Sequence, residues 1–198
     1  MKDEKRKLRE EIWGLMEEEN IARFPLPAYG RIPNFEGSDI AAEKVTKLEE
    51  WKGARTVIAN PDFAQRKVRE LALRGGKTLI MASPRLRRGY LKIDPEGVKG
   101  REDFASTIRG AFRYGKRVRE LPKPDLVITG CVAVDGDGNR LGKGGGYGDR
   151  EIKTIKDKFG DVPVITTVHN CQVVEGIPHE EHDQGVEIIV TPTKVIEV

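Results

Sequence analysis

Short apolar runs alternate with helical patterns along most of this chain. A continuous apolar run predicts a buried strand, and apolar residues spaced three and four positions apart predict an amphipathic helix. The predicted strands are residues 56–59, 77–82, 126–129, 164–168, 188–190 and 194–196. The predicted helices are residues 3–19, a second helix after an N-cap at Ser38, a third from the turn at residues 60–62 to Gly75, and then residues 102–112 and 151–159.

Strands that alternate with helices predict an α/β fold, because helical crossovers connect parallel strands and cover both faces of their sheet. We therefore expect a three-layer, Rossmann-like architecture with helices on both faces of an open, mainly parallel sheet. The chain has 198 residues, of which 37% are hydrophobic, so residues 1–198 are expected to form a single domain around one core. Ligands of such sheets bind at the carboxyl ends of the strands.

The composition argues against several classes of protein. No apolar run approaches the roughly 20 residues of a membrane span, and the N-terminus is charged where a signal peptide would be apolar, so a cytoplasmic protein is expected. Two cysteines, Cys131 and Cys171, are too few for a disulfide framework. The net charge of +3 arises from 35 basic and 32 acidic residues. Because the charges are mixed, the basic clusters at residues 5–9, 85–88 and 113–119 are expected to be solvated rather than to bind nucleic acid.

A glycine-rich run, RLGKGGGYGDRE at residues 140–151, follows an apolar segment and precedes a helical one. Glycines let backbone N–H groups converge on one point, and the N-terminus of the next helix adds partial positive charge, so the run is typical of a phosphate-binding loop. Lys143 adds a full positive charge, and Asp149 is a candidate ligand for Mg²⁺ shared with the phosphates. The competing interpretation is a surface turn without a ligand.

Two cations near the N-terminus, Lys5 and Arg9, are four residues apart and therefore lie on one face of the first predicted helix. Such a pair can hold a triphosphate, although most pairs of this kind only face water. His179 and His182 flank two glutamates, but their spacing differs from the H-E-x-x-H zinc motif and follows Pro178, so no transition-metal site is expected there. Asp183 is expected to position another group or to cap a turn.

These motifs, taken in order, resemble those of the 5-formyltetrahydrofolate cyclo-ligase family, also called methenyltetrahydrofolate synthetase. The resemblance rests on K-x-x-L-R at residues 5–9, RLGKGGGYGD at 140–149 and PHEEHD at 178–183 before IIVT at 188–191, and it covers nearly the whole chain. It implies a three-layer α/β fold. It also implies conversion of 5-formyltetrahydrofolate to 5,10-methenyltetrahydrofolate with ATP and Mg²⁺, through phosphorylation of the formyl oxygen and then ring closure with loss of phosphate.

Carried over by motif position, the resemblance assigns the nucleotide to both ends of the chain. Lys5, Arg9 and Lys143 would contact ATP phosphates, with Arg9 and Lys143 acting in catalysis, and Asp149 would hold Mg²⁺. The loop that would bind ATP consists of Gly142, Lys143, Gly144, Gly145, Gly146 and Tyr147. The reaction needs alignment and charge neutralisation rather than a covalent nucleophile, and these residue types supply both.

Two departures point to a divergent branch of the family. Typical members read G-x-G-x-G-Y-Y-D-R, whereas Gly148 replaces the second tyrosine here and Gly145 stands where some members have lysine. Residues 31–35, 60–62 and 84–86 resemble the branch that contains the methenyltetrahydrofolate synthetase domain-containing proteins and the cyclo-ligase-like proteins linked to thiamine metabolism. Resemblance to that branch predicts ATP binding, but it does not predict turnover of a folate.

The substrate pocket implied by the resemblance lies near residues 31–38. Phe35 could stack on a substrate ring, and Arg31 or Asn34 could hold polar groups. Arg85, which follows an apolar strand, could meet a carboxylate or phosphate. The competing interpretation is a proline-rich surface loop whose phenylalanine fills the core, with Arg85 as a solvated charge.

The leading hypothesis is an ATP-dependent and Mg²⁺-dependent cyclo-ligase acting on a reduced folate or a related heterocycle, as a monomer or small homo-oligomer. One alternative is an ATP-binding relative with a different heterocyclic substrate, such as one in thiamine-related salvage. The other is a non-catalytic nucleic-acid-binding protein that uses the basic clusters. No aromatic and basic RNA-recognition motif supports the last alternative.

Overall fold

The computed structural model describes all residues from Met1 to Val198 and has a central sheet of eight strands. In spatial order these strands are β13 (Val195–Glu197), β12 (Ile188–Val190), β10 (Val164–Thr167), β7 (Leu126–Thr129), β3 (Thr56–Ala59), β4 (Thr78–Ala82), β5 (Tyr90–Ile93) and β6 (Lys116–Val118). The five strands from β12 to β4 run parallel. The strands β13, β5 and β6 pair antiparallel at the two edges. The predicted mainly parallel sheet is therefore confirmed.

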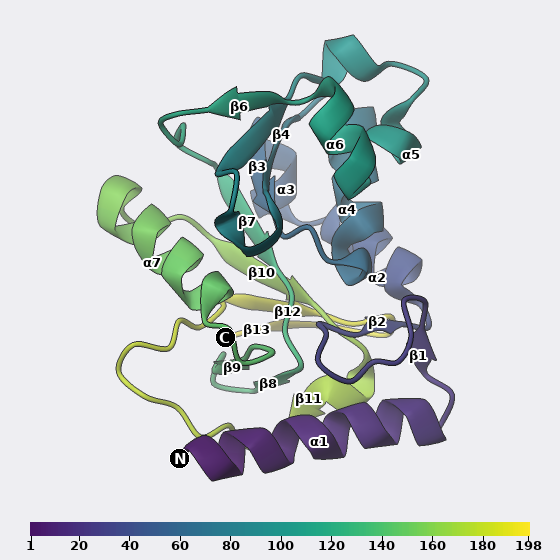
Figure 1. Cartoon of the computed structure of the whole chain (residues 1–198), viewed down its shortest axis with the longest axis vertical. Helices are drawn as coiled ribbons and strands as arrows, with labels where there is room; N and C mark the ends of the chain where they lie inside the picture. Colours follow the sequence, from purple (N-terminus) through teal and green to yellow (C-terminus); the bar gives the residue numbers. More distant parts are fainter.

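Helices cover both faces of this sheet, so the predicted three-layer architecture is also confirmed (Figure 1). The helices are α1 (Lys2–Glu18), α2 (Ser38–Val45), α3 (Glu49–Gly53), α4 (Arg66–Arg74), α5 (Glu102–Ala105), α6 (Ile108–Tyr114) and α7 (Tyr147–Phe159). Short 3₁₀ helices occupy Phe63–Gln65, Pro84–Leu86, Pro95–Val98 and Asn170–Gln172. No helix combines the length and the apolar character needed to cross a membrane.

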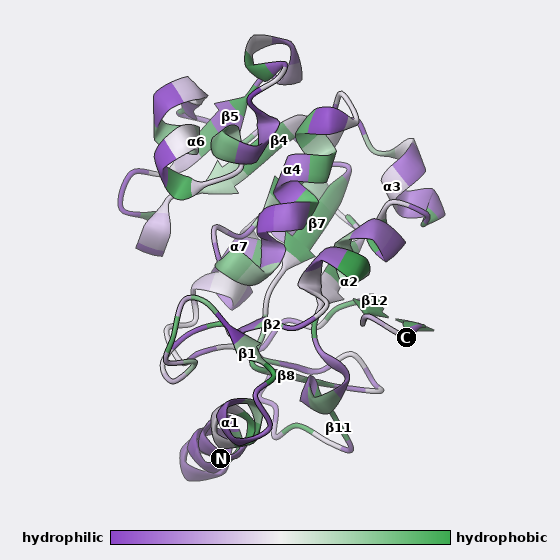
Figure 2. Ribbon diagram, turned by 90° about the vertical axis from the view of Figure 1, so that its right-hand side faces the viewer, coloured by the Kyte–Doolittle hydropathy of each residue, from purple (hydrophilic) through white to green (hydrophobic).

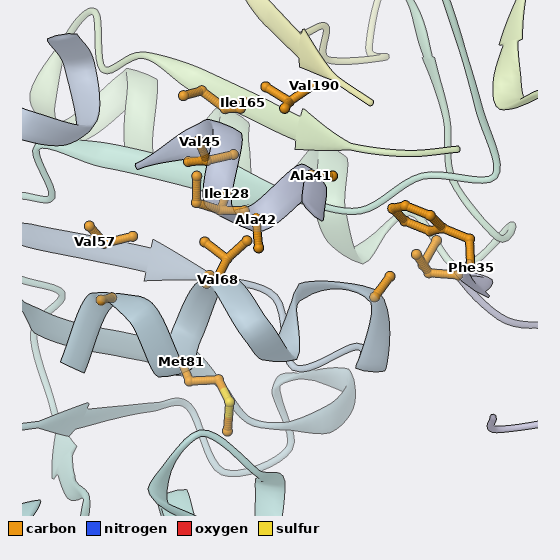
Figure 3. Packing of buried hydrophobic residues seen from close by; sticks show 14 of the residues in the cluster. Phe35, Ala41, Ala42, Val45, Val57, Val68, Met81, Ile128, Ile165 and Val190 are labelled. Carbon is orange, nitrogen blue, oxygen red and sulfur yellow. The ribbon is translucent and has the colours of Figure 1, made fainter. Parts of the chain in front are cut away.

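Two apolar cores lie on opposite faces of the sheet because successive strand residues alternate between faces. Val57 packs in the larger core with residues of α2 and α4, including Val45 and Val68 (Figure 3). The next strand residue, Ile58, packs in the smaller core against Ile152 and Ile155 of α7. Figure 2 shows the central strand β7 as hydrophobic, whereas α1 and α3 carry many hydrophilic residues.

Several element boundaries differ from the sequence predictions. The N-cap of α2 is Gly37 rather than Ser38, and Gly37 has a φ of 81°. A Cβ at Gly37 would lie 2.8 Å from Cγ of Pro192, so packing as well as the backbone conformation requires glycine. The predicted helix 102–112 is two helices, because the Thr107 side chain accepts a hydrogen bond from the Gly110 N–H and starts a new one.

The sequence analysis also missed the edge strands β5 and β6. They occupy the stretch after Arg85 and Leu86 that has no regular apolar pattern, and a segment that read as a basic connector. Burial alternates along β5, whereas β6 exposes both Lys116 and Arg117, and charged residues of this kind are common at a sheet edge. Edge strands lack the continuous apolar signal of buried parallel strands, which is why the pattern did not show them.

A smaller sheet positions the glycine-rich run. It consists of β11 (Val173–Val174), β8 (Ala133–Asp135) and β9 (Arg140–Leu141), and it follows the carboxyl end of β7. The run therefore leaves β9 of the small sheet, not a strand of the large one, and α7 begins inside it at Tyr147 rather than at Glu151. Figure 1 shows α1 running along this end of the molecule beside β8, β9 and β11. A hairpin of β1 (Ala22–Arg23) and β2 (Asn34–Phe35) lies next to it.

Candidate functional site

The glycine-rich loop, residues 142–146, connects β9 to the N-terminus of α7. Gly144 and Gly146 adopt φ values of 109° and 67°, which side chains other than glycine rarely adopt. Gly146 is the N-cap of the 13-residue helix α7. Because glycine has no side chain that could cap the helix, the first N–H groups of α7 are open to solvent or a ligand. The loop therefore has the backbone geometry of an anion-binding turn at a helix N-terminus.

The glycine-rich loop forms a wall between two cavities. A cavity of about 550 Å³ is lined by six cationic side chains, and we call it the basic cavity: Lys2, Lys5, Arg9, Arg140, Arg150 and Lys153. A cavity of about 440 Å³ combines apolar and charged side chains, and we call it the mixed cavity. Both are lined by Arg140, Gly142, Gly145, Gly146 and Asp149. A ligand in one cavity is therefore separated from a ligand in the other by little more than glycine backbone.

The structure brings Lys5 and Arg9 to the glycine-rich loop from the other end of the chain. Arg9 Nε donates to the carbonyl oxygen of Gly142 at 2.7 Å, and its guanidinium lies near Gly144. Lys5 is buried, and its Nζ contacts Glu180 at 3.0 Å and Asp183 at 2.5 Å. Burial lowers the pKa of Lys5, but the hydrogen bonds to Asp183 and Glu180 outweigh it and raise the pKa overall.

The loop around Asp183 connects Lys5 to the glycine-rich loop. Asp183 Oδ2 accepts hydrogen bonds from Lys5 and from the Glu180 N–H, so it both positions a cation and closes a turn, as predicted. The next residue, Gln184, donates its N–H to Asp149 Oδ1 at 3.0 Å. Glu180, His182 and Asp183 each have an atom that could bind a metal ion, and these atoms lie within 4.8 Å of one another. The two carboxylates already form ion pairs with the Lys5 ammonium.

Arg140 holds Asp149 at the shared wall. Its guanidinium is buried, and it donates to Asp149 Oδ1 at 2.6 Å and to the carbonyl oxygen of Gly130 at 3.1 Å. A Cβ at Gly148 would lie 3.0 Å from Nη2 of Arg140, so the missing side chain leaves room for the guanidinium. Because both hydrogen bonds to Asp149 reach Oδ1, its second carboxylate oxygen carries no hydrogen bond from the protein. The sequence analysis did not assign a role to Arg140, although it begins the glycine-rich run.

Asp62 and Lys143 face each other across the mixed cavity, with Nζ 3.6 Å from Oδ1. Burial raises the pKa of Asp62, and the positive charges of Lys143 and Arg69 oppose this rise. Arg69 is buried and donates to the carbonyl oxygens of Asn60, Asp62 and Ser106, so it holds the turn that carries Asp62. Lys143 was predicted as a phosphate contact, and it lies on the mixed-cavity side of the loop rather than beside Lys5 and Arg9.

Glu151 adds a second carboxyl group to the mixed cavity. It lies one helical turn after Tyr147 in α7, and 3% of the residue is exposed. Burial raises the pKa of Glu151 to about 7, although the positive charge of Arg140 opposes the rise. No local pattern selects Glu151 among the many acidic residues, because its position in the cavity depends on the tertiary fold.

Apolar side chains form the rim of the mixed cavity. Phe63 lines it, and its ring lies edge-on to Phe24, with ring centroids 5.2 Å apart. Tyr147 and Ile108 line it as well, and each is more than a third exposed. Partly exposed aromatic side chains around a polar interior suit a planar heterocyclic ligand. Of these residues the sequence analysis selected only Tyr147.

The structure separates the four residues predicted to bind substrate into two pairs. Arg31 and Arg85 line the mixed cavity. Phe35 is 1% exposed, packs in the larger core and lies near the ring of His169, so it cannot stack on a ligand (Figure 3). Asn34 uses its amide on the carbonyl oxygen of Phe24 and the N–H of Phe35. The alternative that the phenylalanine fills the core is thus the correct one, because the side chains of successive residues in β2 point to opposite faces.

Comparison with known proteins assigns the family. A model of the 5-formyltetrahydrofolate cyclo-ligase family matches residues 1–192. The chain belongs to this family. It is 43% identical over 204 residues to the methenyltetrahydrofolate synthase domain-containing protein of Bos taurus, and 41% identical over 205 residues to that of Homo sapiens. Each alignment covers 97% of this chain and 53% of the relative, so the chain spans about half the length of these curated relatives.

Cyclo-ligase family members named for the activity itself match a shorter part of the chain. The 5-formyltetrahydrofolate cyclo-ligase of Escherichia coli K12 is 42% identical over 80 residues, which is 40% of this chain and 43% of that protein. The NMR structure of Aquifex aeolicus 5,10-methenyltetrahydrofolate synthetase superposes with a TM-score of 0.63 at 21% identity, covering 98% of this chain and 92% of that one. The last comparison confirms the fold.

Proposed function

We propose that this protein is an ATP-dependent and Mg²⁺-dependent enzyme that closes a ring on a formylated reduced folate or a related heterocycle. The observation that carries the proposal is the glycine-rich loop between the two cavities. A cationic cavity on one side suits a triphosphate, and a cavity of about 440 Å³ with an aromatic rim on the other suits a heterocycle. Family membership supports the same type of reaction.

The basic cavity fits nucleotide phosphates. The amides of the glycine-rich loop and the N-terminus of α7 would bind phosphate oxygens, and a side chain at Gly144 would approach Arg9. Arg9 is tied to the loop by its Nε only, which leaves its two terminal nitrogens for phosphate. Lys5 has two acceptors and three hydrogens, so one hydrogen remains available on the cavity side.

The shared wall fits the transferred group and its metal ion. Asp149 offers a carboxylate oxygen that the protein leaves without a hydrogen bond, and oxygen is the ligand that Mg²⁺ prefers. Lys143 reaches the same wall from the mixed-cavity side, where it would neutralise charge on the phosphoryl group as that group passes to the acceptor oxygen. Bound Mg²⁺-ATP would supply the phosphoryl group that activates the formyl oxygen.

The protein's own contribution is alignment and exclusion of water. The glycine-rich loop would hold the terminal phosphate and the formyl oxygen on either side of one wall, so that the oxygen approaches phosphorus along a fixed direction. Asp62 and its partner Lys143 would fix the heterocycle from the floor of the mixed cavity, and Phe63 and Tyr147 would cover it. No covalent intermediate on the enzyme is required.

The test is a spectrophotometric assay of purified protein with 5-formyltetrahydrofolate, ATP and Mg²⁺ that follows the methenyl product and ADP together. Equal amounts of the two products support the proposal. If ATP binds but neither product forms, the substrate is another heterocyclic amide, as in the thiamine-related alternative. If ATP does not bind, the enzyme hypothesis fails, and salt-dependent binding of RNA would then favour the nucleic-acid alternative.

A further inference from the structure

The segment from residue 85 to residue 120 concentrates the positive charge of this protein. It holds 11 lysines and arginines against five acidic residues, so it carries a net charge of +6, and the other 162 residues carry −3. The segment forms β5, α5, α6 and β6. Figure 1 shows α5, α6 and β6 at the end of the molecule opposite α1. The charges are therefore segregated in space, although the sequence as a whole is nearly balanced.

Six cations of this segment are exposed and form no ion pair and no side-chain hydrogen bond within the protein. We call them the basic edge: Arg88, Lys92, Arg109, Arg113, Lys116 and Arg117. Two acidic side chains of the segment are already paired with other cations. Glu96 contacts Lys99 at 2.6 Å, and Glu102 faces Arg74 of α4 at 3.6 Å. The basic edge is thus left without counter-charges from these acids.

Packing joins the basic edge into one surface. The Arg88 guanidinium lies over the Phe112 ring of α6, with its Cζ 5.5 Å from the ring centroid. Arg109 precedes Phe112 by three residues and Arg113 by four, so all three side chains share one side of the helix. The helix leads directly into β6, the last strand of the sheet. Loop, helix and edge strand therefore present their cations side by side.

This arrangement places like charges next to one another. Lys92 of β5 lies directly opposite Lys116 in the antiparallel register of β5 and β6. Arg109 and Arg113 form a like-charged pair four residues apart on α6. Both arrangements cost stability when no anion lies nearby. Protection of a sheet edge against strand pairing explains cations on β6, but it does not explain those on α6 and in the loop before β5. The surface suits an external polyanion.

Aromatic rings beside the basic edge indicate the kind of polyanion. Phe104 is 37% exposed, and its ring lies edge-on to Tyr114 with centroids 6.2 Å apart. The Arg113 guanidinium lies over the Tyr114 ring, with its Cζ 5.8 Å from the centroid, so the aromatic pair adjoins the basic edge. Exposed rings stack on the bases of a single strand while cations hold its phosphates. Four of the six cations are arginines, which bind phosphate through paired hydrogen bonds.

We propose that the basic edge binds a single-stranded nucleic acid, with phosphates on its arginines and lysines and a base on Phe104. None of the six cations lines the basic cavity or the mixed cavity. The proposal therefore does not depend on the proposed reaction, and the protein can hold Mg²⁺-ATP and a nucleic acid at the same time. The sequence analysis expected these clusters to be solvated, because it could not show that the fold gathers them at one edge.

The test is a fluorescence-anisotropy titration of a labelled oligouridylate of 12 nucleotides with the full chain at several salt concentrations. Arg113→Ala combined with Arg117→Ala should weaken binding at least about tenfold, because each removes a charged hydrogen-bond donor. The slope of log affinity against log salt should become shallower by about 1.4, since each phosphate contact on a single strand contributes about 0.7. Both side chains are exposed and unpaired, so a thermal melt should show a folded variant.

A matched control removes two arginines from the other end of the molecule. Arg6→Ala combined with Arg23→Ala changes the net charge equally and breaks only surface contacts, including the pairs with Asp3 and Glu36. Affinity and salt slope should stay nearly unchanged. Equal losses in the two double variants would show that the oligonucleotide responds only to overall charge and would overturn the proposal.

Phe104→Ala tests the contact with a base. It should weaken binding of the oligouridylate about fivefold or more and leave binding of inorganic polyphosphate unchanged, because polyphosphate has no base to stack. If Phe104→Ala leaves oligouridylate binding unchanged, the edge is a phosphate-binding surface only and the proposal is wrong. Excess Mg²⁺-ATP at constant ionic strength should not displace the oligouridylate. Displacement would place the strand in the basic cavity and would also overturn the proposal.

Discussion

Arg140 donates a hydrogen bond of 2.6 Å to Asp149 at the wall between the two cavities, and the two residues come from opposite ends of the glycine-rich run. The guanidinium is buried and reaches across the whole loop, so the pair fixes the loop's start to the first turn of α7. This ion pair positions the Asp149 carboxylate, which is proposed to hold Mg²⁺. It also makes the loop's geometry depend on the absence of a side chain at Gly148.

Arg140→Ala is expected to destabilise the protein by about 3 kcal/mol, because it leaves Asp149 without its ionic partner and removes the guanidinium hydrogen bond to the Gly130 carbonyl. Urea unfolding measures the change in the free energy of unfolding. Arg150→Ala is the matched control, since Arg150 is exposed, its side chain donates a hydrogen bond to the Gly145 carbonyl, and its guanidinium lies over the Tyr147 ring. Similar losses for the two variants would contradict the assigned role of Arg140.

Gly148→Tyr, which introduces the residue of typical family members, should displace Arg140 from α7, because even a Cβ at this position comes within 3.0 Å of the guanidinium. We expect weaker binding of Mg²⁺-ATP with less change in binding of Mg²⁺-free ATP, since Asp149 loses its fixed orientation. Isothermal titration with and without Mg²⁺ measures both affinities. Unchanged affinity for Mg²⁺-ATP would show that Asp149 does not need this pair.

Lys143→Ala is expected to lower kcat/KM about 100-fold or more while leaving stability nearly unchanged. The side chain is 43% exposed and its Nζ lies 3.6 Å from Asp62, a distance at which an ion pair contributes little to folding. Steady-state kinetics and a thermal melt measure the two effects. A large drop in the melting temperature with normal kcat would instead indicate a structural lysine.

The two phenylalanines of the substrate region should behave in opposite ways. Phe35→Ala removes a ring that is 1% exposed and should cost about 3 to 5 kcal/mol of stability. Phe63→Ala removes a ring that is 37% exposed at the rim of the mixed cavity, and it should chiefly weaken binding of a heterocycle. Unfolding and binding measurements on both variants distinguish a core residue from a ligand contact. Loss of binding without loss of stability in the Phe35 variant would contradict the packing.

The Lys5–Asp183 pair should contribute its full stability above about pH 4 and progressively less at lower pH. Partial burial raises the pKa of Asp183, but the hydrogen bonds from Lys5 and from the Glu180 N–H outweigh it, so the pKa lies below its ordinary value. A carboxylate with a lowered pKa in the folded state adds stability above its unfolded pKa, and that stability is lost as the pH falls through the folded pKa.

Asp183→Asn should therefore lower the free energy of unfolding at pH 7 by about 1 kcal/mol and by less at pH 3. Paired thermal melts at the two pH values measure this difference. An equal effect at both pH values would mean that the carboxylate charge does not contribute.

The sequence predicted the parts of this molecule whose signals are local. The apolar runs at residues 56–59 and 126–129 predicted the parallel sheet, and the glycine-rich run predicted a loop at a helix N-terminus. The four-residue spacing of Lys5 and Arg9 placed both on one helix face, and the fold brings that face to the loop.

Residues whose roles depend on tertiary packing could not be predicted in this way. Arg140, Asp62 and Glu151 are polar residues among many others in the sequence, and only the folded chain brings them together around one cavity. Phe35 was instead proposed as a ligand contact and is a core residue. An aromatic residue in a proline-rich loop resembles a ligand contact until the register of β1 and β2 is known. The position of Lys143 depends on the direction in which the glycine-rich loop turns.

The central claim is that the glycine-rich loop brings a phosphoryl group from the basic cavity to an oxygen atom in the mixed cavity. The most direct test uses 5-formyltetrahydrofolate labelled with ¹⁸O in the formyl group, with ATP and Mg²⁺, followed by mass analysis of the released phosphate. The account predicts one ¹⁸O atom in each phosphate formed with methenyl product. Release of unlabelled phosphate during product formation would contradict phosphoryl transfer across this loop.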